Sequence, residues 1–112
     1  MTEKDHLMLV VWGIPPALLD VGFEDDALAV RRRATDLHAE GAIEDLVILL
    51  GKIGVELTKA YVRAGGYVRR APEGIQDDAL KYEDDLFTAR CHVAVARAAA
   101  KRVVRGDGWG LN

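Results

Sequence analysis

Hydrophobic residues recur every three or four positions along three long segments of the chain. The longest segment runs from about Asp77 to Val104, and its apolar members are Ala79, Tyr82, Leu86, Ala89, Val93, Ala96, Ala100 and Val103. This near-heptad spacing predicts a helix that packs against other helices. Acidic residues crowd its start and basic residues its end, which is the order that the helix dipole favours.

Two further stripes precede this one in the chain. The first predicts a helix that Gly41 ends as a C′ residue. Its apolar members are Phe23, Ala27, Val30, Ala34 and Leu37. The second stripe predicts a helix from about Ala42 to Ala64, which the pair Gly65 and Gly66 would stop.

The helix from Ala42 has two unusual features. The run from Leu46 to Leu50 is apolar on every side, so it should lie at the centre of the bundle or in a subunit interface, unless the N-terminal segment folds back over it. Gly51 and Gly54 fall inside the helix, where each costs about 1 kcal/mol relative to alanine. We therefore expect another backbone to pack closely at these glycines.

The beginning of the chain allows two interpretations. The pattern favours a helix over residues 2–12, capped by Thr2. The alternative is a lone strand from Leu7 to Trp12, which would need a strand from a partner chain. Pro15 and Pro16 then predict a short helical turn that continues through Leu19.

These elements predict one all-α domain over residues 1–112. Its architecture is an antiparallel helical bundle of three long helices plus a short N-terminal helical segment. Residues 22–105 would form the bundle core, and residues 106–112 an irregular tail. At about 1.5 Å per residue, the last helix should overhang its neighbours by several turns while still carrying an apolar stripe. We therefore expect a homodimer or a higher oligomer.

Composition narrows the class of protein. The chain is 50% hydrophobic and 29% charged, which is typical of a globular domain and not of a disordered one. Its net charge of −3 argues against nucleic acid as a partner, although Arg31, Arg32 and Arg33 form a short basic run. The apolar run before Gly13 is too short for a membrane span and lacks signal-peptide flanks, so we expect a cytoplasmic protein with no membrane partner.

Histidine and cysteine give no recognisable catalytic pattern. His6, His38 and His92 fall in three different segments, and only Glu3 and His6 have the spacing of a di-iron helix motif. Cys91 is the single cysteine, so it cannot form an internal disulfide. Its side chain should diverge from that of His92 by about 100°, which leaves Cys91 as a small packed residue.

Two segments resemble the signature helices of the MazG-type nucleoside triphosphate pyrophosphohydrolases. Residues 49–61 read Leu-Leu-Gly-Lys-Ile-Gly-Val-Glu-Leu-Thr-Lys-Ala-Tyr, and residues 78–87 read Asp-Ala-Leu-Lys-Tyr-Glu-Asp-Asp-Leu-Phe. The resemblance covers roughly residues 43–100. It implies an all-α, oligomeric protein in which carboxylates of the two helices hold Mg²⁺ against the phosphates of a nucleotide.

The resemblance assigns roles to a few residues. Glu56 would be a metal ligand from the first signature helix, and Asp85, with Asp84 in the neighbouring register, a ligand from the second. Lys59 and Arg63 would bind the nucleotide. The set of acids is incomplete, because Lys52 and Ile53 stand where the first signature helix is expected to carry acids, and Tyr82 stands three residues before Asp85.

Two functions are therefore open at this point. One is a divergent MazG-like protein that binds a nucleotide and Mg²⁺ and whose catalytic activity is uncertain. The alternative is a non-enzymatic helical adaptor or assembly module that acts through its dimer interface. The position of Glu56 relative to Asp85 should help to separate them.

Overall fold

The regular elements of the protein are all helices. The computed structural model describes residues 3–106, and no strand occurs among them. The helices are α1 (Glu3–Trp12), α2 (Ile14–Asp20), α3 (Glu24–Ala34), α4 (Ala42–Arg70), the 3₁₀ turn η1 (Glu73–Ile75) and α5 (Gln76–Arg105). The all-α prediction is confirmed. The predicted tail of residues 106–112 lies outside the described residues apart from Gly106.

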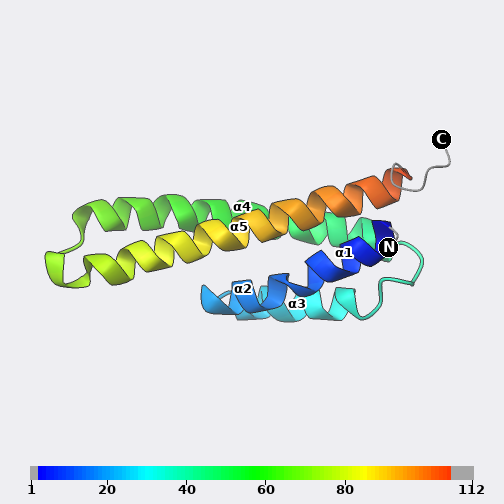
Figure 1. Cartoon of the computed structure of the whole chain (residues 1–112), viewed down its shortest axis with the longest axis horizontal. Coiled ribbons are helices and arrows are strands. Elements are labelled where there is room, and N and C mark those ends of the chain that lie inside the picture. The colour runs from blue at the N-terminus through cyan, green and yellow to red at the C-terminus, as the bar shows by residue number, and fades with distance from the viewer. Residues whose placement is uncertain (1–2, 107–112) are drawn as a thin grey trace.

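The molecule has two layers of unequal length. Helices α4 and α5 form a long antiparallel hairpin, and the shorter helices α1, α2 and α3 lie along one end of it (Figure 1). Within the shorter layer, α1 and α2 pack on α5, and α3 packs on α4. The described part of the chain measures 55 × 25 × 22 Å, because the other end of the hairpin projects beyond α1–α3.

The core lies where the two layers meet. Its large members come from the predicted stripes and from the N-terminal helices. They include Leu7, Val11, Ile14, Leu18, Val30, Leu46, Leu50, Ile53, Leu57, Leu86 and Val93. Burying a side chain of this size stabilises the fold by about 1.5–3 kcal/mol, so the stripes themselves account for how the helices pack.

The N-terminal segment is helical, as the pattern favoured. Leu7 and Val11 face the core from α1, which excludes the alternative of a strand. Pro15 and Pro16 lie in the first turn of α2, where a missing backbone N–H costs little. The predicted cap at Thr2 lies outside the described residues.

Two predicted helix ends are wrong. Helix α4 continues through Gly65 and Gly66 to Arg70. A Cβ on Gly65 would lie only 2.9 Å from Oε2 of Glu83 in α5, so the glycine permits close packing instead of ending the helix. Helix α3 ends at Ala34, and Gly41 lies directly before α4 with a left-handed φ of 76°, which favours glycine. Its role is to start the next helix.

The expected overhang of the last helix is also only partly correct. Helix α5 has 30 residues and α4 has 29, so the two cover each other along almost their whole length. The overhang exists relative to α1–α3 (Figure 1). The projecting end of the hairpin is therefore a pair of helices without a second layer.

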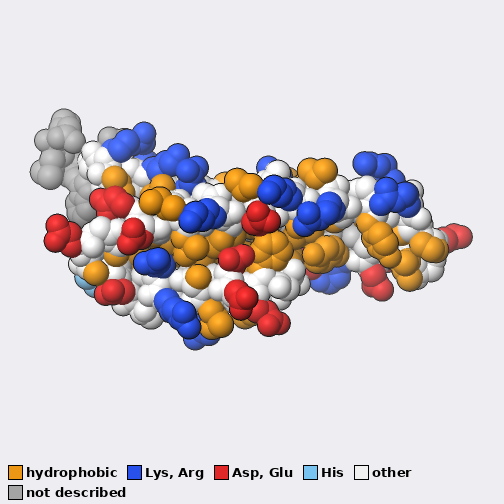
Figure 2. All heavy atoms as spheres, turned by 180° about the vertical axis from the view of Figure 1, so that it is seen from behind, with side chains coloured by type: hydrophobic (Ala, Val, Ile, Leu, Met, Phe, Trp, Pro, Cys, Tyr) orange, Lys and Arg blue, Asp and Glu red, His pale blue; other side chains and the backbone are white. Residues whose placement is uncertain are grey.

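Some residues of the apolar run in α4 are buried in the core, and others are exposed. Leu46 and Leu50 are buried, Val47 and Leu49 are partly buried, and Ile48 is 58% exposed. The N-terminal segment does not fold over this run, because no described Cα atom of α1 lies within 8 Å of one in α4. Figure 2 shows hydrophobic side chains along the middle of the rear face and out to the far end of the hairpin.

Candidate functional site

The acids that the family resemblance assigned to a metal are held by lysines. The carboxylate of Glu56 lies 3.4 Å from Nζ of Lys59, one turn further along α4. The carboxylate of Asp85 accepts a 2.9 Å hydrogen bond from Lys81 of α5, which raises the pKa of that lysine. Asp84 is exposed. Within residues 3–106, no group of three or more His, Cys, Asp or Glu side chains could hold a metal ion.

The acidic neighbour of Glu56 comes from outside the signature helices. Asp26, in the first turn of α3, lies within electrostatic range of Glu56. Partial burial, followed by the charges of Asp25 and Glu56, raises the pKa of Asp26 above its ordinary 3.8. Burial and the like charges of Asp25 and Glu56 therefore destabilise the ionised form of Asp26.

The structure brings two of the histidines together. His6 of α1 and His92 of α5 line one apolar hollow of about 610 Å³, together with Cys91. Cys91 is exposed, so the prediction of a small packed residue is wrong. The burial of Cys91 was wrongly predicted because Cys91 lies on the outer side of α5, whereas α4, α1 and α2 all pack on other sides. His38 lies exposed in the loop before α4.

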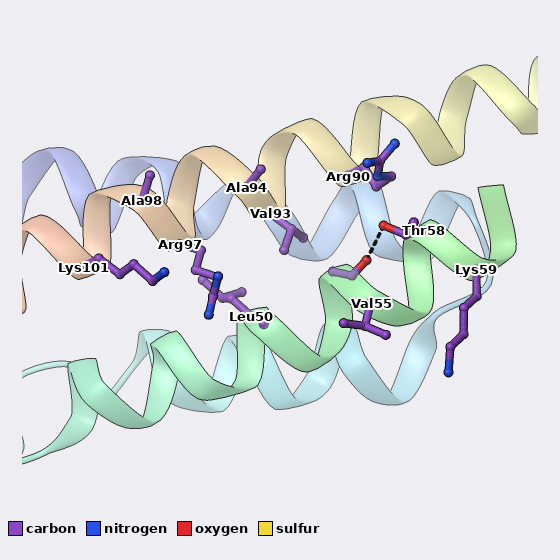
Figure 3. A pocket seen from close by; sticks show the side chains of 12 residues that line it. Leu50, Val55, Thr58, Lys59, Arg90, Val93, Ala94, Arg97, Ala98 and Lys101 are labelled. Atoms are coloured by element: carbon purple, nitrogen blue, oxygen red, sulfur yellow. Dashed lines mark hydrogen bonds between the residues drawn. The ribbon is translucent and has the colours of Figure 1, made fainter. Parts of the chain in front are cut away.

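A groove of about 520 Å³ runs between α4 and α5 (Figure 3). Its floor consists of small and apolar residues, among them Leu50, Gly51, Gly54, Val93, Ala94 and Ala98. Four cations line it, namely Lys59, Arg90, Arg97 and Lys101, and no carboxylate does. None of the lining residues belongs to α1, α2 or α3, so the groove opens on a face of the hairpin that the shorter layer leaves uncovered. We call this the open face.

Of the two cations predicted to bind a nucleotide, only Lys59 lines this groove. Arg63 lies exposed on the next turn of α4. The resemblance did not indicate Arg90, Arg97 or Lys101, because its signature segment in the last helix ends at Phe87 and it assigned no role beyond that residue. Arg90 and Arg97 lie seven residues apart, as do Ala94 and Lys101. This spacing brings residues to one side of a helix, so it could have indicated that these cations lie on one face.

Arg97 explains one of the central glycines. Its Nε donates a 3.3 Å hydrogen bond to the backbone carbonyl of Val47, across the groove. A Cβ on Gly51 would lie 3.1 Å from the same Nε atom, so glycine makes room for the guanidinium group. At Gly54 the nearest atom is a methyl group of Val93, 3.8 Å away. The expected close neighbour at these glycines is therefore a side chain of α5 and not a backbone.

Arg90 makes no ion pair among the described residues and contacts an aromatic ring instead. Its guanidinium carbon lies 5.5 Å from the centre of the Tyr61 ring, which in turn lies 5.8 Å from the ring of Phe87. This is the range of a cation–π contact. Arg97 and Arg90 are thus positioned by a carbonyl group and an aromatic ring. Of the four groove cations, only Lys59 makes an ion pair with an acid among the described residues, namely with Glu56.

A second apolar stripe runs along the open face of α4, beside the groove. Its members alternate at spacings of three and four, and none is charged. They are Ile48, Gly51, Val55, Thr58, Val62 and Gly65. The large members Ile48, Val55 and Val62 are 58%, 54% and 66% exposed. We call this the α4 outer stripe; it has the spacing of a packed helix face, yet its large members remain more than half exposed.

No protein-family model, curated protein or solved structure matches the chain. Among the described helices, none is long and apolar enough to cross a membrane. The class that the fold defines is therefore an all-α helical bundle built on a long hairpin.

Proposed function

We propose that the protein is a non-enzymatic helical assembly module that binds a second copy of itself through the open face of the hairpin. The observation that carries the proposal is the α4 outer stripe. A helix at the surface of a monomer needs one apolar stripe, whereas α4 has a buried stripe and an exposed one at the same heptad spacing.

The energetics are compatible with self-association. Covering Ile48, Val55 and Val62 would contribute up to about 1.5–3 kcal/mol for each fully buried side chain, and a twofold dimer covers them on both copies. Association costs about 4–15 kcal/mol in lost freedom of motion, which is the same range.

The experiment is a measurement of mass by sedimentation equilibrium at micromolar concentration. We expect about twice the chain mass of 12.3 kDa. Val55→Lys combined with Val62→Lys should reduce it to the monomer mass, because two charges would enter the interface. Leu28→Lys is the matched control, since it also replaces an exposed hydrophobic residue but lies on α3.

A wild-type mass near 12.3 kDa at all concentrations would contradict the proposal. So would a dimer that the combined Val55→Lys and Val62→Lys variant leaves intact, because the open face would then not be the interface. Circular dichroism of each variant should retain the helical signal, which separates loss of assembly from loss of folding.

A second candidate function is that of a divergent MazG-like protein that binds a nucleotide and Mg²⁺. The feature that favours it is the set of cations that line one groove, Lys59, Arg90, Arg97 and Lys101, because cations suit an anionic ligand. Titration calorimetry with ATP, with and without Mg²⁺, tests binding. Mg²⁺-dependent release of pyrophosphate that Glu56→Gln abolishes would establish this function in place of the first.

A further inference from the structure

The exposed residues on the outer side of α5 form a pattern that bears on how two copies would meet. Every residue of the pattern is exposed. Its members are Leu80, Asp84, Phe87, Cys91, Ala94, Ala98, Lys101 and Arg105. The spacings alternate between four and three and read the same from either end. We call this the α5 outer stripe.

Building on the proposed self-association, we propose that two copies pair antiparallel along their α5 outer stripes, about a twofold axis near residues 92 and 93. Because the spacing is symmetric, each position then meets a position of the other copy. Phe87 faces Ala98, so a large side chain meets a small one. Asp84 faces Lys101, so an acid meets a base, and Cys91 faces Ala94.

A parallel arrangement lacks this complementarity. It would place Asp84 beside Asp84, Lys101 beside Lys101 and Phe87 beside Phe87 of the other copy. Like charges in these places repel, and two rings occupy the same level of the interface. The distribution of charge along α5 also favours the antiparallel arrangement. Two groove cations, Arg97 and Lys101, lie in its second half, and five acids lie in its first half, namely Asp77, Asp78, Glu83, Asp84 and Asp85.

The surroundings of the stripe also suit a helix of a second copy. Ala94 and Ala98 border the groove on the α4 side, and Phe87 and Cys91 border the hollow on the α1 side. The stripe is thus a ridge between two apolar depressions, which is the shape that ridge-into-groove packing requires. Neither Asp84 nor Lys101 makes an ion pair within residues 3–106, whereas the adjacent Asp85 pairs with Lys81.

Disulfide trapping tests the pairing directly. In a Cys91→Ala background, Asp84→Cys and Lys101→Cys are made as separate chains and treated with oxidised glutathione, which accepts the electrons of the two thiols. Each variant alone should remain a single chain on a non-reducing gel, and an equimolar mixture should give a covalent dimer. The bond needs Cα atoms about 4.4–6.8 Å apart, which only facing positions reach. Asp25→Cys mixed with Lys101→Cys is the collision control and should not cross-link.

Charge reversal is an independent measurement, and its double variant simply exchanges the two side chains. Asp84→Lys alone and Lys101→Asp alone should each weaken dimerisation about tenfold, because each reverses two exposed pairs of the dimer. The double variant should restore the wild-type affinity, since the pairs are then exchanged. Parallel pairing gives no such restoration.

The outcomes separate the two proposals. A dimer in which the Asp84→Cys chain cross-links to itself, or in which the double charge reversal fails to restore affinity, would overturn the antiparallel pairing and leave the assembly function standing. A wild-type protein that sediments as a monomer would overturn both.

Discussion

The hairpin has two regions that share one sequence pattern and differ in what they bury. In the region beside α1–α3, the stripe buries large residues such as Leu50, Ile53, Leu57 and Leu86. In the projecting end, which we define as residues 60–82, the buried residues are three alanines, Ala60, Ala64 and Ala79. The large residues Tyr67, Ile75, Leu80 and Tyr82 of that end are 41–49% exposed.

The difference shows what a second layer contributes. Two helices alone can cover only a narrow strip between them, and small residues fill that strip. Large side chains become fully buried only where α1–α3 supply a third and fourth surface (Figure 1). We therefore expect the projecting end to contribute little to the free energy of unfolding and to open more easily than the rest.

The largest expected effect tests this contrast with matched substitutions. Ile53 is 2% exposed in the covered region, and Ile75 is 42% exposed in the projecting end. Ile53→Ala should lower the free energy of unfolding by about 2–5 kcal/mol, through lost burial and a cavity, and Ile75→Ala by less than about 1 kcal/mol. Urea denaturation at one fixed protein concentration measures both. Equal costs would remove the distinction between the regions.

A smaller effect is expected at the glycines of the covered region. Gly54→Ala should stabilise the protein by about 1 kcal/mol, because alanine favours the helix and its Cβ meets Val93 at an ordinary distance. Gly51→Ala should gain less or nothing, since its Cβ must displace the Arg97 guanidinium. Thermal unfolding of the two variants side by side checks this. An equal gain at both positions would mean that Arg97 is not held in place.

A change of about 0.5 kcal/mol is expected for Asp26, where α3 meets α4. The raised pKa of Asp26 means that the folded state favours its protonated form, so the ionised form costs stability at neutral pH. Asp26→Asn should therefore stabilise the protein at pH 7, and the gain should vanish as the pH falls below 3.8. Glu24→Gln is the control, because Glu24 lies in the same helical turn and is not among the charges that raise this pKa. A gain that is independent of pH would contradict the electrostatic cause.

The smallest effect is expected from Mg²⁺. Glu56 and Asp85 lie near the boundary between the covered region and the projecting end, and each is engaged by a lysine. Two carboxylates leave most of the ion's waters in place, so binding should be weak. Even at a Mg²⁺ concentration equal to Kd, the stabilisation is only about 0.4 kcal/mol. If Mg²⁺ raised the melting temperature by more than this small stabilisation predicts, and Glu56→Gln abolished the rise, the boundary would be a metal site.

Periodicity was sufficient to predict most of the fold. The stripes of α4 and α5 predicted both helices, because buried residues must recur at helical spacing. The end of α4 could not be predicted in the same way. A pair of glycines, such as Gly65 and Gly66, usually stops a helix. Only the position of Glu83 on the neighbouring helix shows that Gly65 makes room for a side chain of α5.

The open face was harder to predict than the core. The all-round apolar run from Leu46 to Leu50 indicated an outward apolar surface, and Ile48 provides it. The rest of the α4 outer stripe was overlooked because glycine and threonine, at Gly51, Thr58 and Gly65, do not register as hydrophobic. Which cations meet around the groove depends on which helix packs against α5, and a single sequence does not reveal that pairing.

Arg97 has a consequence for the alignment of the two long helices. Heptad stripes rich in alanine look nearly the same after a shift of seven residues, so apolar contacts alone allow the hairpin to slide. The hydrogen bond from Arg97 to the carbonyl of Val47 links positions 50 residues apart, and it needs the space that Gly51 leaves. A hairpin shifted by seven residues would place the side chain of Glu44 or Thr58 where Gly51 lies, so the guanidinium group would lose this space and its bond to Val47. One polar residue in an apolar seam thus selects a single register, and that register also determines which residues of α4 and α5 appear together on the open face.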